Sequence, residues 1–94
     1  MYKIVGYTKN SGVIKENNIE WVNYTLHCVY TPPFETKNLV GCRVQEVKIP
    51  NKVFTYFTEE IGIENIIGCS VRFTMEERTY NGKSRIVVTD IEPI

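Results

Sequence analysis

Residues 5–28 have the sequence VGYTKNSGVIKENNIEWVNYTLHC, which predicts two long antiparallel strands joined through the polar turn Glu16-Asn17-Asn18. Asn tolerates left-handed backbone angles, so a turn at these residues has a physical basis. Successive side chains of a strand point to opposite faces of a sheet. The apolar side chains of the second strand fall on alternate positions: Val22, Tyr24, Leu26, Cys28 and Tyr30. The intervening positions, which predict an outer face, carry Trp21, Asn23, Thr25 and His27.

The length and composition are those of a single globular domain. With 94 residues, of which 43% are hydrophobic, the chain is long enough to form a modest core without a metal ion or disulfide bonds. It has neither an apolar run near the ~18 residues that a membrane span needs nor a basic-then-apolar leader. We therefore expect one domain over residues 1–94, located in the cytoplasm and not associated with a membrane.

The formal net charge is zero, with eleven basic and eleven acidic side chains. Such a balance argues against a strongly basic nucleic-acid-binding protein. The charges are unevenly distributed, because residues 1–58 hold seven Lys or Arg against four Glu, whereas residues 59–94 hold four against seven acidic residues. A dipolar surface of this kind can still present one basic face.

The three cysteines, Cys28, Cys42 and Cys69, each lie in an alternating apolar pattern. Free cysteine is among the most frequently buried residue types, so we expect three small buried side chains in a reducing compartment. A metal site with His27 is disfavoured, because no CxxC pair is present and the neighbouring His27 and Cys28 point to opposite faces of a strand. The sequence thus predicts neither a metal ion nor a cofactor.

Residues 2–15 predict the first strand, in which Gly6 and Gly12 mark bulges or bends that let a small sheet curl into a barrel. The second strand spans residues 19–30. A loop is predicted over Thr31–Asn38, because its two prolines cannot donate ladder hydrogen bonds.

The third strand is predicted over Leu39–Ile49, with Val40, Cys42 and Val44 on one side and Arg43 and Gln45 on the other. Val47 and Ile49 are apolar in the opposite phase, which indicates a bulge near Glu46. A short helix follows over residues 52–61, with Asn51 as its N-cap and Gly62 as its C-cap. Its apolar stripe consists of Val53, Phe54, Phe57 and Ile61.

The last two strands are predicted over Cys69–Tyr80 and Ser84–Ile91, joined by the strong hairpin signal Asn81-Gly82. In the fourth strand, the inward set is Cys69, Val71, Phe73 and Met75. Three strands, a short helix and a two-stranded hairpin, in this order, are the pattern of the all-β, five-stranded oligonucleotide/oligosaccharide-binding (OB) barrel, a Greek-key fold.

Three stretches also resemble a known family. They are Gly6-Tyr7-x-Lys9-x-Ser11-Gly12, the strand Glu20-Trp21-x-Asn23-Tyr24-x-Leu26-x-Cys28, and Val40-Gly41-Cys42-Arg43-Val44. These motifs resemble the small single-stranded-DNA-binding proteins of bacteriophages, most closely those of filamentous phages and of phages or mobile elements of Gram-positive bacteria. The resemblance implies an OB barrel, often dimeric, that coats and protects single-stranded DNA during replication in the host cytoplasm, with little sequence preference. The neutral net charge departs from the family pattern.

Single-strand binding requires cations beside the phosphates and flat side chains on which bases stack. The outward-facing groups that supply both are the candidate nucleic-acid-binding residues: Tyr7, Lys9, Lys15, Trp21, His27, Arg43, Gln45, Arg72, Tyr80, Lys83 and Arg85. Structural roles are the alternatives. Trp21 can pack at a subunit interface or over a barrel end, Tyr7 and Tyr80 can be ordinary surface tyrosines, and the arginines can be solvated or pair across strands.

The sequence does not predict an enzyme. It has one histidine, none of the nucleophile, phosphate-loop or metalloprotease motifs, and acidic pairs (Glu59-Glu60 and Glu76-Glu77) whose neighbouring side chains point to different faces. The rival function is that of a protein-binding adaptor or structural module, which would use Trp21 and the Pro32-Pro33-Phe34 segment. RNA binding is a third possibility, because stacking accommodates either backbone. We also expect a homodimer, since unpaired strand edges on a neutral surface favour association.

Overall fold

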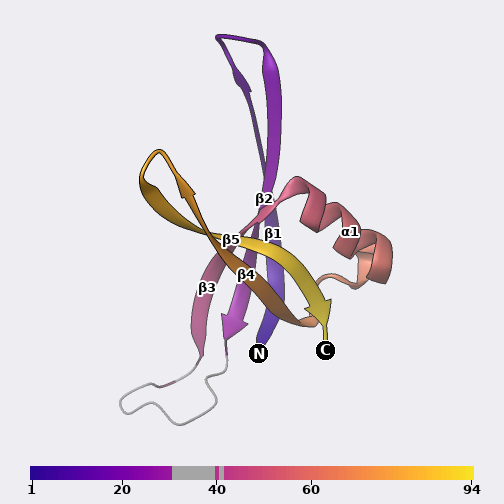
Figure 1. The fold of residues 1–94 in the computed structure, drawn as a ribbon. Helices are drawn as coiled ribbons and strands as arrows, with labels where there is room; N and C mark the ends of the chain where they lie inside the picture. The colour runs from indigo at the N-terminus through magenta and orange to yellow at the C-terminus, as the bar shows by residue number, and fades with distance from the viewer. Residues whose placement is uncertain (31–39, 41) are drawn as a thin grey trace.

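The computed structural model describes residues 1–30, 40 and 42–94, which form one five-stranded antiparallel sheet and one α-helix (Figure 1). The elements are β1 (Tyr2–Ile14), β2 (Ile19–Tyr30), β3 (Arg43–Pro50), α1 (Asn51–Ile61), the 3-10 turn η1 (Ile63–Asn65), β4 (Ser70–Tyr80) and β5 (Lys83–Pro93). The strand order in the sheet is β3-β2-β1-β4-β5. The predicted all-β class, the five strands and the position of the helix are confirmed. The sheet is not closed, because β3 and β5 form its two edges within the described residues.

Both hairpin turns form where the sequence predicts them. Asn18 has φ 53°, and the N–H of Ile19 donates to Asn17 Oδ1 at 3.2 Å, which closes the turn between β1 and β2. Asn81 and Gly82 have φ 50° and 76°, the pair of positive values that a two-residue type I′ turn requires. The predicted loop over Thr31–Asn38 and the predicted strand start at Leu39 lie outside the described residues.

The two glycines of β1 have different roles. The register between β1 and β2 shifts between Ile4 and Gly6, so the bulge predicted there is confirmed. β1 pairs with β4 only before this bulge, at Tyr2↔Val71 and Lys3↔Ser70. Gly12 stands in regular register opposite Trp21, so it does not mark a bulge.

The third strand differs from its prediction. β2 and β3 pair in continuous register from Asn23↔Pro50 to Tyr30↔Arg43, so there is no bulge near Glu46. Val40, Cys42 and Val44 were expected to face the core, but Val40 and Cys42 precede the strand and all three are exposed. The core phase of β3 is instead Arg43, Gln45, Val47 and Ile49, of which only Val47 and Ile49 are buried. Apolar side chains occur in both alternating sets of β3, Val44 in one and Val47 and Ile49 in the other. The sequence therefore did not show which set faces the core.

The helix α1 covers the core with the predicted stripe. Phe54 and Phe57 are buried, while Val53 and Ile61 are half-buried against the same cluster. Gly62 ends the helix with φ 85° and donates its N–H to Thr58 O at 2.9 Å, as a C-cap does. Asn51 is not the N-cap, because it is the first helical residue and Pro50 precedes it in the cap position. Proline suits the start of a helix, where its missing N–H is not needed.

The core lies between α1 and the inner face of the sheet. Its fully buried side chains include Ile4, Leu26, Ile49 and Val71. Cys28 is also buried, and this burial raises the pKa of its thiol to about 11, because the thiolate is disfavoured away from water. Cys69 is half-buried against the core, whereas Cys42 is exposed, so the burial predicted for Cys42 is wrong.

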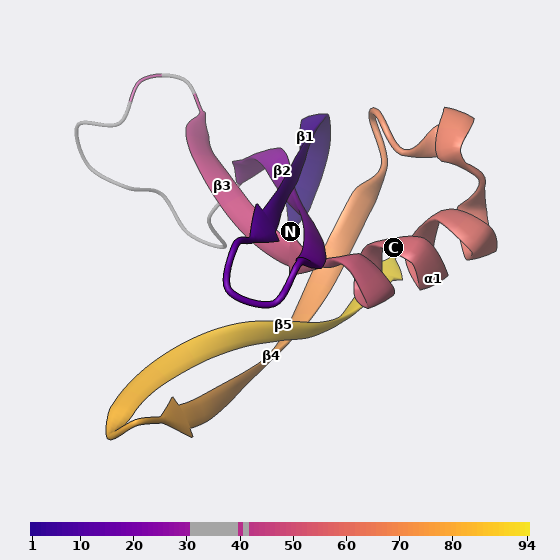
Figure 2. The same ribbon diagram turned by 90° about the horizontal axis from the view of Figure 1, so that it is seen from above.

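Two hairpin arms extend beyond this core (Figures 1 and 2). Every residue from Thr74 to Tyr80 in β4 and from Lys83 to Ile86 in β5 is exposed. In Figure 2 the tip of the β4–β5 arm and the helix α1 lie at opposite ends of the view. The residues on either side of the β1–β2 turn are likewise mostly exposed. These arms bury little apolar surface, so their side chains are available for contacts with other molecules.

The boundary between core and arm can be tested with matched substitutions. Ile49 is fully buried and Ile86 is 71% exposed, although both lie in strands. We expect Ile49→Val to lower the free energy of unfolding by about 0.5–1.5 kcal/mol, because it removes a buried methyl group. Ile86→Val should change it by less than about 0.5 kcal/mol. Urea denaturation measures both values, and equal losses would contradict the described core.

Candidate nucleic-acid interface

The outer face of the β1–β2 arm is apolar near its tip. Residues directly opposite in an antiparallel pair share a face, and the pairs Gly12↔Trp21 and Ile14↔Ile19 lie on the same face two positions apart. Ile14, Ile19 and Trp21, called here the tip patch, remain 43%, 53% and 41% exposed. Exposed apolar groups of this kind are suited to nucleobases or to another protein.

The indole ring of Trp21 lies across Gly12. A Cβ atom placed on Gly12 would come within 2.6–2.8 Å of three ring atoms of Trp21, Cζ2, Cε2 and Nε1. Glycine therefore makes room for the ring, which in turn covers backbone that a glycine leaves open. The outward placement predicted for Trp21 is confirmed, and the ring is partly covered by its own hairpin.

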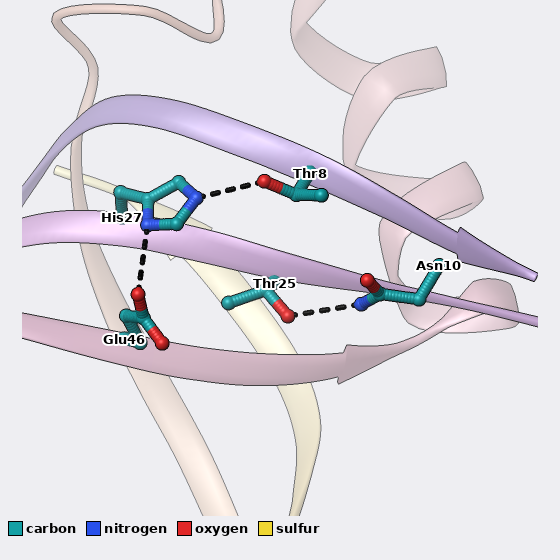
Figure 3. A network of polar contacts seen from close by, with 5 residues as sticks. All are labelled: Thr8, Asn10, Thr25, His27 and Glu46. Atoms are coloured by element: carbon teal, nitrogen blue, oxygen red, sulfur yellow. Dashed lines mark hydrogen bonds and ion pairs between the residues drawn. The ribbon is translucent and has the colours of Figure 1, made fainter.

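Next to the tip patch, side-chain amides form a small network. The Nδ2 group of Asn10 donates to Asn23 Oδ1 at 3.0 Å. It also donates to Thr25 Oγ1 at 3.0 Å (Figure 3). All three side chains lie on the outer face, because Asn10 is opposite Asn23 and Thr25 is two positions further along β2. This part of the face is polar but carries no charge of its own.

Further along β2, the ring of His27 is held by protein groups. His27 Nε2 lies 2.9 Å from Thr8 Oγ1, and Nδ1 lies 3.5 Å from a carboxylate oxygen of Glu46 (Figure 3). Since an ionised carboxylate only accepts hydrogen bonds, Nδ1 of a neutral imidazole carries the proton and Nε2 accepts from the Thr8 hydroxyl. Both ring nitrogens thus have partners within the sheet, which leaves the ring face for any contact with a base.

Two other predicted residues of β1 are on the face opposite to the expected one. Tyr7 and Lys9 lie opposite Leu26 and Tyr24, in the core phase of the sheet, so their outward placement is wrong. The ring centroid of Tyr7 is 5.4 Å from that of Phe54 and 6.4 Å from that of Tyr24. Tyr7 therefore packs at the margin of an aromatic group whose centre is the Tyr24–Phe54 stack, with centroids 3.7 Å apart. The bulge after Ile4 shifts the alternation of β1 by one residue, so Tyr7 and Lys9 fall on the core face of the sheet.

Arg43, Gln45, Arg72 and Lys15 are all exposed, but the structure does not gather them into one site. Arg43 and Gln45 lie on the same face of β3 as the buried Val47 and Ile49, which is the face opposite to the predicted one. They are exposed because they lie at the start of the strand, beyond the core. Arg72 lies opposite Glu92 in the register of β4 and β5, at the core end of β4. Lys15 lies in the turn of the β1–β2 arm.

The β4–β5 arm brings the remaining candidates together. Arg78 lies directly opposite Arg85, and Tyr80 directly opposite Lys83, on one face of the arm; these four residues are called here the hairpin cluster. All four are exposed. Like charges directly opposite each other destabilise a hairpin, so the two arginines favour a bound anion between them. Glu76 offsets part of the repulsion through a 3.4 Å ion pair with Arg78, but the pair is exposed and therefore weak.

Arg78 and Lys48 were not among the predicted nucleic-acid-binding residues. Arg78 precedes Tyr80 by two positions, so the alternation that placed Tyr80 outward also placed Arg78. Lys48 lies opposite Thr25 on the outer face, and the erroneous bulge near Glu46 concealed its phase.

Comparisons of the chain with protein-family models, curated proteins and solved structures found no match. No helix in the described part of the chain has the length and apolarity to cross a membrane. Within residues 1–30, 40 and 42–94, no three His, Cys, Asp or Glu side chains lie together as metal ligands would. The arguments on function therefore rest on the geometry of the site.

The contact between Trp21 and Gly12 has a spectroscopic consequence. Trp21 is the single tryptophan of the chain, so its fluorescence reports on this contact alone. We expect Gly12→Ala to displace the ring and to move its emission to longer wavelength. Gly6→Ala is the matched control, because a Cβ atom there would meet only His27 atoms at 3.6 and 3.9 Å. Unchanged emission in Gly12→Ala would show that the ring lies elsewhere.

Proposed function

We propose that this protein binds single-stranded DNA with little sequence preference, as a coating and protecting protein. The observation that carries the proposal is the hairpin cluster, in which Arg78, Lys83 and Arg85 share one face of an exposed arm with Tyr80. Cations that contact phosphates and an aromatic ring that stacks on any base are the two groups that such binding needs.

We also propose that the sheet is an open form of the OB barrel. β1 pairs with both β2 and β4, the helix stands between β3 and β4, and the opening lies between β3 and β5. OB folds are partly open five-stranded barrels, and they bind oligonucleotides with the β2–β3 face and the two loops that follow β1 and β4. In this chain those two connections are the turns of the two exposed arms. The phage-protein resemblance of the sequence is consistent with the same assignment, including a role in phage or mobile-element replication.

Variants of Tyr80 test the stacking contribution. We expect Tyr80→Ala to weaken binding of a fluorescent oligothymidine by about 1–3 kcal/mol, because one stacked base is lost. Tyr80→Phe keeps the ring and should bind like the wild type. Fluorescence anisotropy measures both, with circular dichroism to confirm that the exposed substitution leaves the fold intact.

The salt dependence identifies the phosphate contacts in the same experiment. For single strands, each neutralised phosphate contributes about 0.7 to the slope of log affinity against log salt. Lys83→Ala should therefore flatten the slope by about this amount for oligothymidine and oligoadenosine alike. Absence of wild-type binding even at low salt would refute the proposal, and equal binding of an RNA oligonucleotide would extend it to RNA.

The tip patch favours a second candidate function, association with another protein, for which we propose a second copy of this chain. Three exposed apolar side chains, Ile14, Ile19 and Trp21, lie on one face at the end of an arm, and burying them against a copy removes them from water. We expect Ile19→Asp to shift a dimer toward monomer in sedimentation equilibrium. Ile63→Asp, at an exposed site in η1, is the control. A wild-type monomer at micromolar concentration would contradict this candidate.

A further inference from the structure

Four of the described cations, Lys48, Lys52, Arg78 and Arg85, line two cavities on the open side of the sheet, between β3 and β5 and beside α1. In the outward phase of β2 and β3, the lysine Lys48 is balanced by Glu46, and His27 is held by Thr8 and Glu46. A phosphate backbone lying across this face would find little net positive charge. The open side of the sheet, where β3, α1, β4 and β5 each contribute one cation to a cavity, offers more positive charge.

A first cavity of about 360 Å³ lies between the ends of β2 and β3 and the edge strand β5. It has a cation on each side, Lys48 from β3 and Arg85 from β5. The side chains of Val22 and Ile86 contribute apolar surface, and Asn23 also lines it. Its volume is at the small end of the range of about 300–1,000 Å³ that holds small organic ligands.

A second cavity of about 440 Å³ adjoins the first and lies between α1 and the β4–β5 arm. The two cavities share Pro50 and Val87, so they are adjacent, and together they are called here the seam groove. The second cavity is lined by two more cations, Lys52 from α1 and Arg78 from β4, and by the exposed ring of Tyr56.

The charge of the seam groove favours a polyanion. Among the described residues that line it, four are cations and one, Asp90, is a carboxylate, and Arg78 also keeps its exposed 3.4 Å ion pair with Glu76. The Oδ1 atom of Asp90 accepts the backbone N–H of Ile91 at 2.9 Å, so part of its hydrogen-bonding capacity is used within the protein. Repulsion among the four cations is relieved when phosphates lie between them.

We propose that a single strand of DNA runs along the seam groove, between β3 and β5 and then past the start of α1; this inference rests on the proposed function. The cations contact phosphates on both sides of the groove, while Pro50 and Val87 form an apolar floor and Tyr56 offers a stacking surface for bases. A duplex stacks its bases inside the helix and presents chiefly phosphates, so the apolar floor selects for an unpaired strand.

Lys52 and Tyr56 of the second cavity provide the sharpest test, because they lie on α1 and belong neither to the tip patch nor to the hairpin cluster. We expect Tyr56→Ala to weaken oligothymidine binding roughly 5- to 150-fold, as one stacked base is lost, while Tyr56→Phe binds like the wild type. Lys52→Ala should lower the salt slope by about 0.7. Lys3→Ala is its control, because Lys3 is exposed and lines neither cavity. All variants replace exposed side chains, and circular dichroism checks their fold.

A footprint on the wild-type protein gives an independent measurement. Bound oligothymidine should protect Lys48 and Lys52 from acetylation and leave Lys3 reactive. If Lys52→Ala and Tyr56→Ala bind like Lys3→Ala, and neither lysine is protected, while Tyr80→Ala remains weakened, then the seam path is wrong and the proposed function stands. If the wild type binds no oligonucleotide at low salt, the proposed function fails and the seam path fails with it.

Discussion

The continuity of the sheet depends on the first residues of β1. β1 pairs with β2 along its whole length, but its ladder with β4 contains only Tyr2↔Val71 and Lys3↔Ser70, extended by a 2.9 Å hydrogen bond from the N–H of Ile4 to Cys69 O. The bulge after Ile4 ends this contact, because an extra residue bends the strand and turns its edge away. Two hairpin ladders are thus joined at one corner. Both are free to extend past the core, and this freedom creates the exposed arms.

The same geometry explains why β3 and β5 remain edges. The helix α1 packs Phe54 and Phe57 over the core, so the apolar interior is already covered without a ladder between the two strands. Unpaired edges invite association, and charged side chains are one means of preventing it. Lys48 on β3 and Arg85 on β5 line the same cavity, so closing the seam would bring two like charges together. An anion between Lys48 and Arg85 would remove this penalty, so the same repulsion accounts for the open edges and for the proposed polyanion site.

The local features of the fold were predictable from the sequence. The turns at Asn18 and Asn81-Gly82, the helix and its Gly62 cap follow from backbone preferences that a few neighbouring residues determine. The faces of the sheet on which Tyr7, Arg43 and Gln45 lie were not predictable. One bulge in β1 moves every following side chain to the other face, and the apolar residues of β1 and β3 occur on both faces. For the candidate site, alternation placed Trp21 and Tyr80 outward. Alternation alone did not predict that Arg78 lies opposite Arg85. It also did not predict that Lys48, Lys52 and Arg85 line adjacent cavities, because that arrangement depends on how the two halves of the sheet meet.

The zero net charge of the chain is compatible with the proposed binding of DNA. The acidic pair Glu59-Glu60 lies near the C-terminal end of α1, whereas Lys52 lies in its first turn. With a rise of about 1.5 Å per residue, the seven residues from Lys52 to Glu59 span about 10 Å along the helix. At physiological ionic strength exposed charges are screened over about 8 Å, which weakens the effect of Glu59 on Lys52, although both line one further surface cavity with Tyr56. In the proposed binding mode, a phosphate in the seam groove lies beside the four cations that line it. The neutral net charge then reduces the long-range attraction of DNA, while the short-range contacts of the proposed site are mainly those of cations.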